Sequence, residues 1–285
     1  MAGVVTSNMS SPVIVIPVFD ALKYLAACLE SIDRSVPPET AVLLIDDAST
    51  DPGVQPLLQS WVEKAPAYRQ VVTHKQNKGF VTAANHGMRL ADNDVVLLNT
   101  DTEVHGDWLQ RLTSCLQSDA SIATATPWSN NGEIVSIPDF CVAQAPPSDA
   151  ETVAAVIESC GTPCYPELPT AVGFCMAISL NAIKQIGLFD EQTFGRGYGE
   201  ENDFCQTAAQ AGLRNVLCDD AYVVHHGGAS FGPLGLKPDE RSMQRLLAKH
   251  PQYQRDVEAF IREDPLAPRR QEILACLERS GVRMR

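Results

Sequence analysis

The sequence lacks the long apolar runs, the basic excess and the leader that mark several large classes of protein. No stretch approaches the roughly 20 uninterrupted apolar residues that cross a membrane. The first residues, MAGVVTSNMSS, contain neither a basic n-region nor an apolar h-region, so we expect no secretory signal. Lys and Arg number 22 against 35 Asp and Glu, a net charge of −13. We therefore expect no transmembrane segment and no nucleic-acid partner, because binding to nucleic acid relies on an excess of basic residues.

The nine cysteines form no recognisable framework. Four of them fall in patterns typical of helices, where a cysteine usually acts as a small buried hydrophobe. These four are Cys28, Cys115, Cys205 and Cys276. The closest pair, Cys160 and Cys164, has no second pair or His cluster at zinc spacing. Reduced thiols favour a cytoplasmic protein, free or peripheral at the inner face of the cell membrane.

The sequence also has no glycine loop that binds phosphate. Pro17-Val18-Phe19-Asp20 follows the first predicted strand, where a nicotinamide-binding fold has G-x-G-x-x-G. The G-x-x-x-x-G-K-[ST] loop of the P-loop NTPases is absent as well. An acidic protein without such a loop can meet the charge of a nucleotide diphosphate through a divalent cation.

What the first half contains is an alternation of short apolar runs with helical patterns. The predicted strands cover 13–16, 41–45, 70–73, 94–98 and 122–126, and the predicted helices 21–32, 54–62, 79–90 and 108–116. Strands that are apolar on both faces predict an α/β fold with a mainly parallel, Rossmann-like sheet flanked by helices. The carboxyl ends of parallel strands then share one edge of the sheet, where open α/β folds bind their ligands.

The second half is less regular. Residues 127–150 are rich in loops, and a glycine-rich loop at 195–199 precedes a helix that starts near Glu200. Further helices are predicted at 150–159 and 181–186, with an apolar run at 171–178 and a strand at 222–224. The tail from about 239 has the pattern of two or three amphipathic helices.

Polar residues gather where two strong strands end. Asp46 and Asp47 follow one strand, and the segment from Asn99 to Glu103 follows another. Acidic side chains at these places lie on the expected ligand edge, although Asp and Asn also start ordinary turns.

Seven segments, in this order along the chain, resemble family 2 glycosyltransferases over roughly residues 12–232. They are 15–20 (VIPVFD), 45–51 (IDDASTD), 77–80 (NKGF) with Asn85 and Gly87, 98–103 (LNTDTE), 187–191 (GLFDE), 197–204 (GYGEENDF) and His225 through Ser230-Phe231. The resemblance implies a GT-A fold, a nucleotide-sugar donor, a divalent metal ion and inversion at the anomeric carbon.

The resemblance also implies a division of the chain. Residues 1–11 form a disordered or extended N-terminus, and 12–232 form the GT-A catalytic domain. Within that domain 12–126 is the nucleotide-binding half and 127–232 the acceptor and catalytic half. Residues 233–285 form a helical C-terminal extension, whose abrupt basic end leads us to expect further transferase domains in a larger protein.

The family residues that contact the nucleotide match positions in the first half of this chain. Asp47, with Asp46, matches the family carboxylate that contacts the nucleoside, and backbone near Pro17 and Phe19 lines the base pocket. An ionised carboxylate accepts a hydrogen bond from the N–H of uracil, thymine or guanine, so UDP, dTDP and GDP sugars all remain candidates. Asn85 is a further nucleotide contact, with a helix-surface amide as the alternative.

The metal motif of the family, D-x-D, has two possible alignments. Its two members are Asn99 and Asp101 in one alignment and Asp101 and Glu103 in the other, so Asp101 is the expected ligand of Mg²⁺ or Mn²⁺ in both. His225 matches a family histidine that completes the metal site, with His226 as the alternative. An imidazole ligand favours Mn²⁺.

The acidic pair of the family corresponds to Glu200 and Glu201. Its second member is the catalytic base, so Glu201 takes that role, and Glu200 and Asp203 are expected near the donor and acceptor. Thr207 stands where the family often has Arg. Acidic residues in a first helical turn also complement the helix dipole, which is the structural alternative.

These residues predict an inverting glycosyltransferase of surface polysaccharide synthesis, with a glycan or lipid-linked saccharide as acceptor. A sugar-1-phosphate nucleotidyltransferase is a second possibility, but it needs a basic, glycine-rich loop after the first strand. A glycan-binding module with a degenerate active site is a third.

Overall fold

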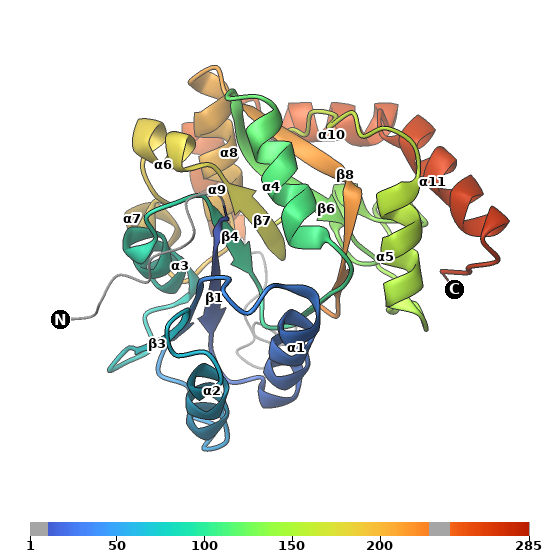
Figure 1. The fold of residues 1–285 in the computed structure, drawn as a ribbon. Coiled ribbons are helices and arrows are strands. Elements are labelled where there is room, and N and C mark those ends of the chain that lie inside the picture. The colour runs from blue at the N-terminus through green and yellow to red at the C-terminus, as the bar shows by residue number, and fades with distance from the viewer. Residues whose placement is uncertain (1–10, 228–239, 285) are drawn as a thin grey trace.

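The structure, a computed structural model, describes residues 11–227 and 240–284. An eight-stranded sheet runs through this part of the chain, with helices on both of its faces (Figure 1). The strands are β1 (Val13–Val18), β2 (Val42–Asp46), β3 (Arg69–Thr73), β4 (Val95–Leu98), β5 (Thr102–Val104), β6 (Ile122–Trp128), β7 (Cys175–Ile178) and β8 (Arg214–His225). The GT-A segment at Ser230-Phe231 lies outside the described residues.

The sheet is mixed. Its strand order is β3-β2-β1-β4-β7-β6-β8-β5. The four strands β3, β2, β1 and β4 are parallel, as predicted, and β6 and β8 are also parallel. β7 runs antiparallel to both β4 and β6, and β5 antiparallel to β8. The carboxyl ends of β1, β2 and β4 therefore open on the same edge.

Every predicted helix is present. The helices are α1 (Leu22–Ser35), α2 (Val54–Glu63), α3 (Phe80–Leu90), α4 (Trp108–Ser118), α5 (Ala150–Ser159), α6 (Leu180–Ile186), α7 (Glu191–Phe194), α8 (Glu200–Gln210), α9 (Glu240–Lys249), α10 (Tyr253–Glu263) and α11 (Ala267–Arg279), with a 3-10 turn at Glu133–Val135. The sequence patterns did not predict α7, the 3-10 turn or β5. They also predicted only the end of β8, at 222–224. Among the described residues no helix has the length and apolarity that spanning a bilayer requires.

The alternation of side chains along the strands produces two cores, one on each face of the sheet. On β1, Ile14, Ile16 and Val18 point into one core and Val13 and Val15 into the other. Helices α1, α2, α4, α5 and α11 cover the first core, and α3, α6, α8 and α9 cover the second. Burying one such aliphatic side chain contributes about 1.5–3 kcal/mol, so the two cores stabilise the sheet whose edge carries the site.

The C-terminal helices pack onto both cores. Leu246 on α9 and Tyr253 on α10 join the core that contains α8, whereas Ile273 and Leu277 on α11 join the opposite core. Figure 1 shows α11 beside α5. The extension thus contributes buried side chains to the same two cores as the sheet.

The expectation that Cys276 is a small buried hydrophobe with a reduced thiol is wrong. Cys160 and Cys276 form a disulfide between the end of α5 and α11, with their Cα atoms 6.2 Å apart. The two residues are 116 positions apart, so no local spacing could reveal the pair. Five of the seven free cysteines are buried, as expected of small hydrophobes, and they include Cys28, Cys115 and Cys205.

Candidate active site

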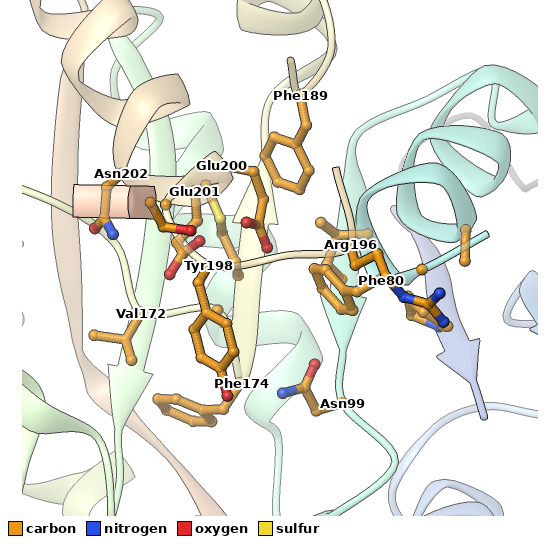
Figure 2. Close-up of a pocket in the computed structure, with 18 of the residues that line it drawn as sticks. Phe80, Asn99, Val172, Phe174, Phe189, Arg196, Tyr198, Glu200, Glu201 and Asn202 are labelled. Atoms are coloured by element: carbon orange, nitrogen blue, oxygen red, sulfur yellow. The ribbon is translucent and has the colours of Figure 1, made fainter. Parts of the chain in front are cut away.

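A cavity of about 410 Å³ opens at the carboxyl edge of the parallel strands. Its walls come from the carboxyl ends of β1, β2, β3 and β4 and the segments that follow them, from β7 and the loop before it, and from the glycine-rich loop that leads into α8 (Figure 2). Helices α9 and α10 add Ser242, Met243, Leu246 and Tyr253. The volume lies within the range of small-molecule sites.

Most of the site residues predicted from the sequence meet in this cavity. The lining includes Pro17, Phe19, Asp47, Asn99, Asp101, Glu200, Glu201 and His225. Four predicted residues do not line it, namely Asp46, Asn85, Glu103 and Asp203. Each of these four is engaged elsewhere by the fold.

Asp47 lies in the wall of the cavity, but its carboxylate also holds the turn before α3. It accepts hydrogen bonds from the backbone N–H groups of Lys78 at 2.9 Å and Gly79 at 2.6 Å, and it lies 2.7 Å from Nδ1 of His74. Gly79 has φ of 95°, and a Cβ atom there would lie 2.7 Å from the Cα atom of Arg196. The turn therefore requires glycine, and Asp47 shapes the cavity wall even before any ligand is considered.

Asp46 and Asn85 do not line the cavity, and their side chains make hydrogen bonds within the protein. Asp46 accepts a hydrogen bond from the backbone of Ser49 at 3.0 Å and another from the Gln55 side chain. Asn85 is buried, and its amide pairs with both the N–H and the carbonyl of Phe189, at 3.0 and 2.9 Å. Asn85 is thus neither a surface amide nor a cavity residue, since it joins α3 to the segment before α7.

Asp101 and His225 form the strongest candidate for holding a metal ion. The Asp101 side chain is 5% exposed, and its Oδ1 atom lies 3.6 Å from Nε2 of His225. The Nδ1 atom of His225 lies 2.6 Å from the carbonyl oxygen of Asn131, which can only accept, so Nδ1 carries the proton. The ring also stacks on Phe174, with centroids 5.1 Å apart. Nε2 is therefore the ring nitrogen that faces Asp101 and the atom of His225 that could hold a metal ion.

Geometry also separates the alternatives that the motif left open. Glu103 lies on β5 and pairs with His226, with Oε1 and Nε2 2.7 Å apart. Neither Glu103 nor His226 lines the cavity, whereas Asn99 and His225 do. Within the described ranges no group of three or more His, Cys, Asp or Glu side chains is arranged to hold a metal ion.

Glu200 and Glu201 begin α8 directly after the glycine-rich loop. The backbone of this loop is left-handed at Gly195, Tyr198 and Gly199, with φ of 57°, 72° and 106°. Figure 2 shows Tyr198 extending from the level of the two glutamates towards Phe174 and Asn99. The loop thus delivers two carboxylates and one aromatic ring to the same cavity.

The two glutamates have unusual protonation behaviour. Burial and the negative charge of Glu201 raise the pKa of Glu200 well above its usual range, and Oε2 of Glu200 is buried without a hydrogen-bond partner. Burial raises the pKa of Glu201 to about 6. In such a pair one group keeps its proton while the other ionises, so Glu201 is the member that can act as a base near neutral pH.

Asp203 lies one turn further along α8 and faces α9. Its carboxylate is 2.7 Å from Nζ of Lys249 and 2.7 Å from Nε2 of His250. Both partners follow Asp203 by more than 40 positions, so the sequence pattern could not reveal them. Asp203 thus links α8, which carries the two glutamates, to α9, which lines the cavity.

Arg196, Glu133 and Tyr253 are among the cavity residues that were not predicted. Arg196 lies in the glycine-rich loop, where its side chain contacts Asn77 and its carbonyl accepts from the N–H of Phe80 at 3.3 Å. Glu133 and Tyr253 reach the cavity from the 3-10 turn and from α10. The glycine-rich loop at 195–199 could have indicated Arg196 as a cavity residue, because Arg196 lies within it. No local sequence pattern predicted that Glu133 and Tyr253 line the cavity.

Residues 13–140 match the family model described as glycosyl transferase family 2. This part of the chain, less than half of its length, is similar to family 2 of the glycosyltransferases. The match covers β1 to β6 and therefore the segments that hold Asp47, Asn99 and Asp101. No curated protein sequence matches the chain.

Solved structures of glycosyltransferases share the fold. GalNAc-T7 with UDP, GalNAc and Mn²⁺ has a TM-score of 0.61 at 17% identity, over 91% of this chain and 55% of its own. The S. aureus TarS fragment 1–349 with UDP-GlcNAc has 0.58 at 15% identity, over 84% and 66%. The mannosyltransferase PcManGT from Pyrobaculum calidifontis, with GDP-Man and Mn²⁺, has 0.54 at 13% identity, over 97% and 78%. These likenesses confirm the GT-A fold.

The chain spans 55% and 66% of the lengths of the first two of these proteins.

Proposed function

We propose that the protein is a metal-dependent, inverting glycosyltransferase. It moves a sugar from a UDP, dTDP or GDP donor to a hydroxyl group of a glycan or lipid-linked saccharide. The observation that carries the proposal is that one cavity is lined both by the Asp101–His225 pair and by a buried glutamate pair in which the pKa of Glu201 is about 6.

The first pair supports binding of the donor through a cation. Mg²⁺ and Mn²⁺ in nucleotide sites take one or two protein ligands and complete their shell with phosphate oxygens and water, so two residues are enough. Asp101 and His225 would hold the ion, and Asn99 lies beside them in the lining. When bound, the ion neutralises the charge that develops on the departing diphosphate. Two of the solved structures described above contain Mn²⁺ together with UDP or GDP-Man.

The second pair supports transfer in a single displacement. The acceptor hydroxyl gives its proton to Glu201 while its oxygen bonds to the anomeric carbon and the bond from that carbon to the diphosphate oxygen breaks. Attack from the face opposite the leaving group inverts the configuration. Glu200 remains protonated and so keeps a second negative charge away from Glu201.

The other predicted activities receive less support. The match to family 2 favours a transferase over a nucleotidyltransferase, and the turn after β1 carries Asp20 rather than a basic loop. The proposed reaction belongs to surface polysaccharide synthesis, with further transferase domains as partners. The disulfide between Cys160 and Cys276 removes the support that reduced thiols gave to a cytoplasmic location.

A panel of nucleotide sugars tests the proposal. We expect one donor class to raise the melting temperature in the presence of Mn²⁺ and to be hydrolysed slowly by the protein without any acceptor. No stabilisation and no hydrolysis with any UDP, dTDP or GDP sugar would instead favour the degenerate binding module.

A further inference from the structure

His74 and His86 form a hydrogen-bonded pair behind the cavity wall, and the proposed reaction gives neither of them a role. His74 directly follows β3, and its side chain is 6% exposed. Its Nδ1 atom lies 2.7 Å from Oδ1 of Asp47, and its Nε2 atom lies 2.8 Å from Nδ1 of His86 on α3. The two rings are nearly parallel, with an interplanar angle of 7° and centroids 5.1 Å apart. A chain of hydrogen bonds thus runs from the cavity residue Asp47 to the half-buried His86.

The chemistry of the three side chains gives these hydrogen bonds a direction. The carboxylate of Asp47 can only accept, so Nδ1 of His74 carries a proton and donates it to Oδ1. In a neutral His74 ring Nε2 then accepts, and His86 donates to it from Nδ1. Buried networks in which each member has its partner rigidify their side chains. The two histidines therefore hold the Asp47 carboxylate in one orientation.

Asp47 keeps the capacity to accept one more hydrogen bond. A carboxylate has about four acceptor positions on its two oxygens. Among the described residues three donors reach it, namely the N–H of Lys78 at 2.9 Å, the N–H of Gly79 at 2.6 Å and Nδ1 of His74. All three belong to the segment between β3 and α3. Since Asp47 lines the cavity, the remaining position is available to a donor group of a ligand there.

The cavity wall beside Asp47 suits a planar ring. The N–H of Asp47 donates to the carbonyl of Val18 at 2.8 Å, which places Asp47 next to Pro17 and Phe19, two further residues of the lining. Phe19 is half-buried, so part of its aromatic side chain is accessible. An aromatic side chain next to a carboxylate suits a heterocycle that stacks on the one and donates a ring N–H to the other.

We infer that His74 and His86 are positioning residues that set the nucleobase specificity of the donor site through Asp47. The inference rests on the proposed function and names the base class of its donor. Uracil, thymine and guanine offer a ring N–H to an acceptor, whereas the corresponding nitrogen of cytosine or adenine carries a lone pair that a carboxylate repels. Because His74 fixes the carboxylate, its loss should weaken binding of the N–H bases and leave that of the others unchanged.

The test measures the affinity for matched nucleoside diphosphates in Mn²⁺ by calorimetry. The pairs are UDP with CDP, dTDP with dCDP, and GDP with ADP, so that the diphosphate is common to both members. We expect wild type to prefer the first member of one pair at least about tenfold, the effect of one hydrogen bond to a charged group. His74→Phe keeps an aromatic ring without a donor and should lower this preference about tenfold. His74→Asn supplies an amide N–H in place of Nδ1–H and should restore it to within about threefold of wild type.

His105→Phe is the matched control. His105 also pairs with a carboxylate, since its Nδ1 atom lies 3.1 Å from Glu151, but neither of these two residues lines the cavity. The base preference of this variant should equal that of wild type. If His74→Phe does not fold, His86→Leu removes only the outer hydrogen bond and should lower the preference by at least about threefold, because His74 is then held from one side only.

Three results would overturn the inference and leave the proposed function standing. They are binding by wild type without any base preference, a preference in the folded variants within about twofold of wild type, and an equal loss of affinity for both members of a pair. The last result would show that His74 only supports the fold, as would a His74→Asn variant no better than His74→Phe. A wild type that binds none of these nucleotides would refute the proposed function and the inference together.

Discussion

The Nε2 atom of His225 lies 3.6 Å from Oδ1 of Asp101, although the two residues are far apart in the sequence. The sheet brings them together, because Thr102 pairs with His225 in the antiparallel ladder between β5 and β8. With Nδ1 committed to the carbonyl of Asn131, Nε2 is the ring nitrogen that faces Oδ1 of Asp101 across this gap. A divalent cation could take both atoms as ligands.

Replacing Asp101 with alanine should therefore remove metal-dependent binding of the donor nucleotide. Even residues behind a metal ligand change affinity 10- to 100-fold, so loss of the ligand itself should cost at least about 100-fold. Calorimetry with UDP and GDP in Mn²⁺ measures the effect. Glu103→Gln is the matched control, since Glu103 pairs with His226 outside the cavity lining. Equal affinity in Asp101→Ala and wild type would refute the assignment.

A histidine pair behind the cavity wall should make the fold sensitive to acid. Nε2 of His74 lies 2.8 Å from Nδ1 of His86, and burial, followed by the charge of His74, lowers the pKa of His86. A histidine whose pKa is lower in the folded than in the unfolded state leaves stability intact at high pH and loses it as the pH falls below its ordinary value. His86→Gln should therefore lose less melting temperature than wild type between about pH 7.5 and about pH 5.5. Parallel melting curves over this range would speak against the account.

The disulfide between Cys160 and Cys276 should contribute strongly to stability. It closes a loop of 116 residues and fastens α11 to the end of α5. Loss of such a crosslink typically costs about 2–5 kcal/mol. Cys276→Ser, or reduction of wild type, should lower the urea midpoint accordingly. Alkylation of the denatured, unreduced protein should label seven thiols, and nine labelled thiols would show that the bond is absent.

The strands that were predicted in full have apolar sequences, whereas β8, which was predicted only in part, contains two aspartates. β1, β2 and β4 are uninterrupted apolar runs, because both of their faces are covered by helices. β8 was predicted only at its end, since Asp219 and Asp220 interrupt the run. Both are buried, and they are paired with Arg269 and Arg111 from distant elements. Such compensation is a tertiary property that a local pattern cannot reveal.

The same contrast holds for the candidate site. The motifs around Asp101, His225 and Glu201 led to residues that line one cavity, because those motifs stand at strand and helix ends. Asp203 and Glu133 differ, since their places depend on α9 and on a left-handed turn.

Asp203 should prove to be a structural residue rather than a catalytic one. Its side chain is 7% exposed and is paired with Lys249 and with the buried His250. Asp203→Asn should lower the free energy of unfolding by about 1–3 kcal/mol, because charge-assisted hydrogen bonds to two partners weaken. Urea unfolding measures this loss, and donor hydrolysis well below the melting temperature should remain close to wild type. Full stability with lost hydrolysis would instead place Asp203 in the chemistry.

The pH dependence of turnover should follow the ionisation of Glu201. Its pKa, raised to about 6, means that the carboxylate is protonated and inactive as a base below that pH and ionised above it. The rate of transfer should therefore rise through about pH 6 and level off towards neutrality. A rate that stays constant down to about pH 4.5, the ordinary range of a glutamate, would contradict this assignment.

Turnover of Glu201→Gln, measured beside its affinity for the donor nucleotide, tests the central claim most directly. Glutamine keeps the size of the side chain but cannot take a proton, so transfer should fall about 10²- to 10⁴-fold. Affinity for the nucleotide in Mn²⁺ should match wild type, because Asp101 lies between β4 and β5 and His225 ends β8, whereas Glu201 lies on α8. If Glu201 only stabilises the start of α8, its replacement should shift the melting temperature slightly and leave turnover nearly intact. A variant that retains more than about a tenth of the wild-type rate would contradict the role of Glu201 as the catalytic base.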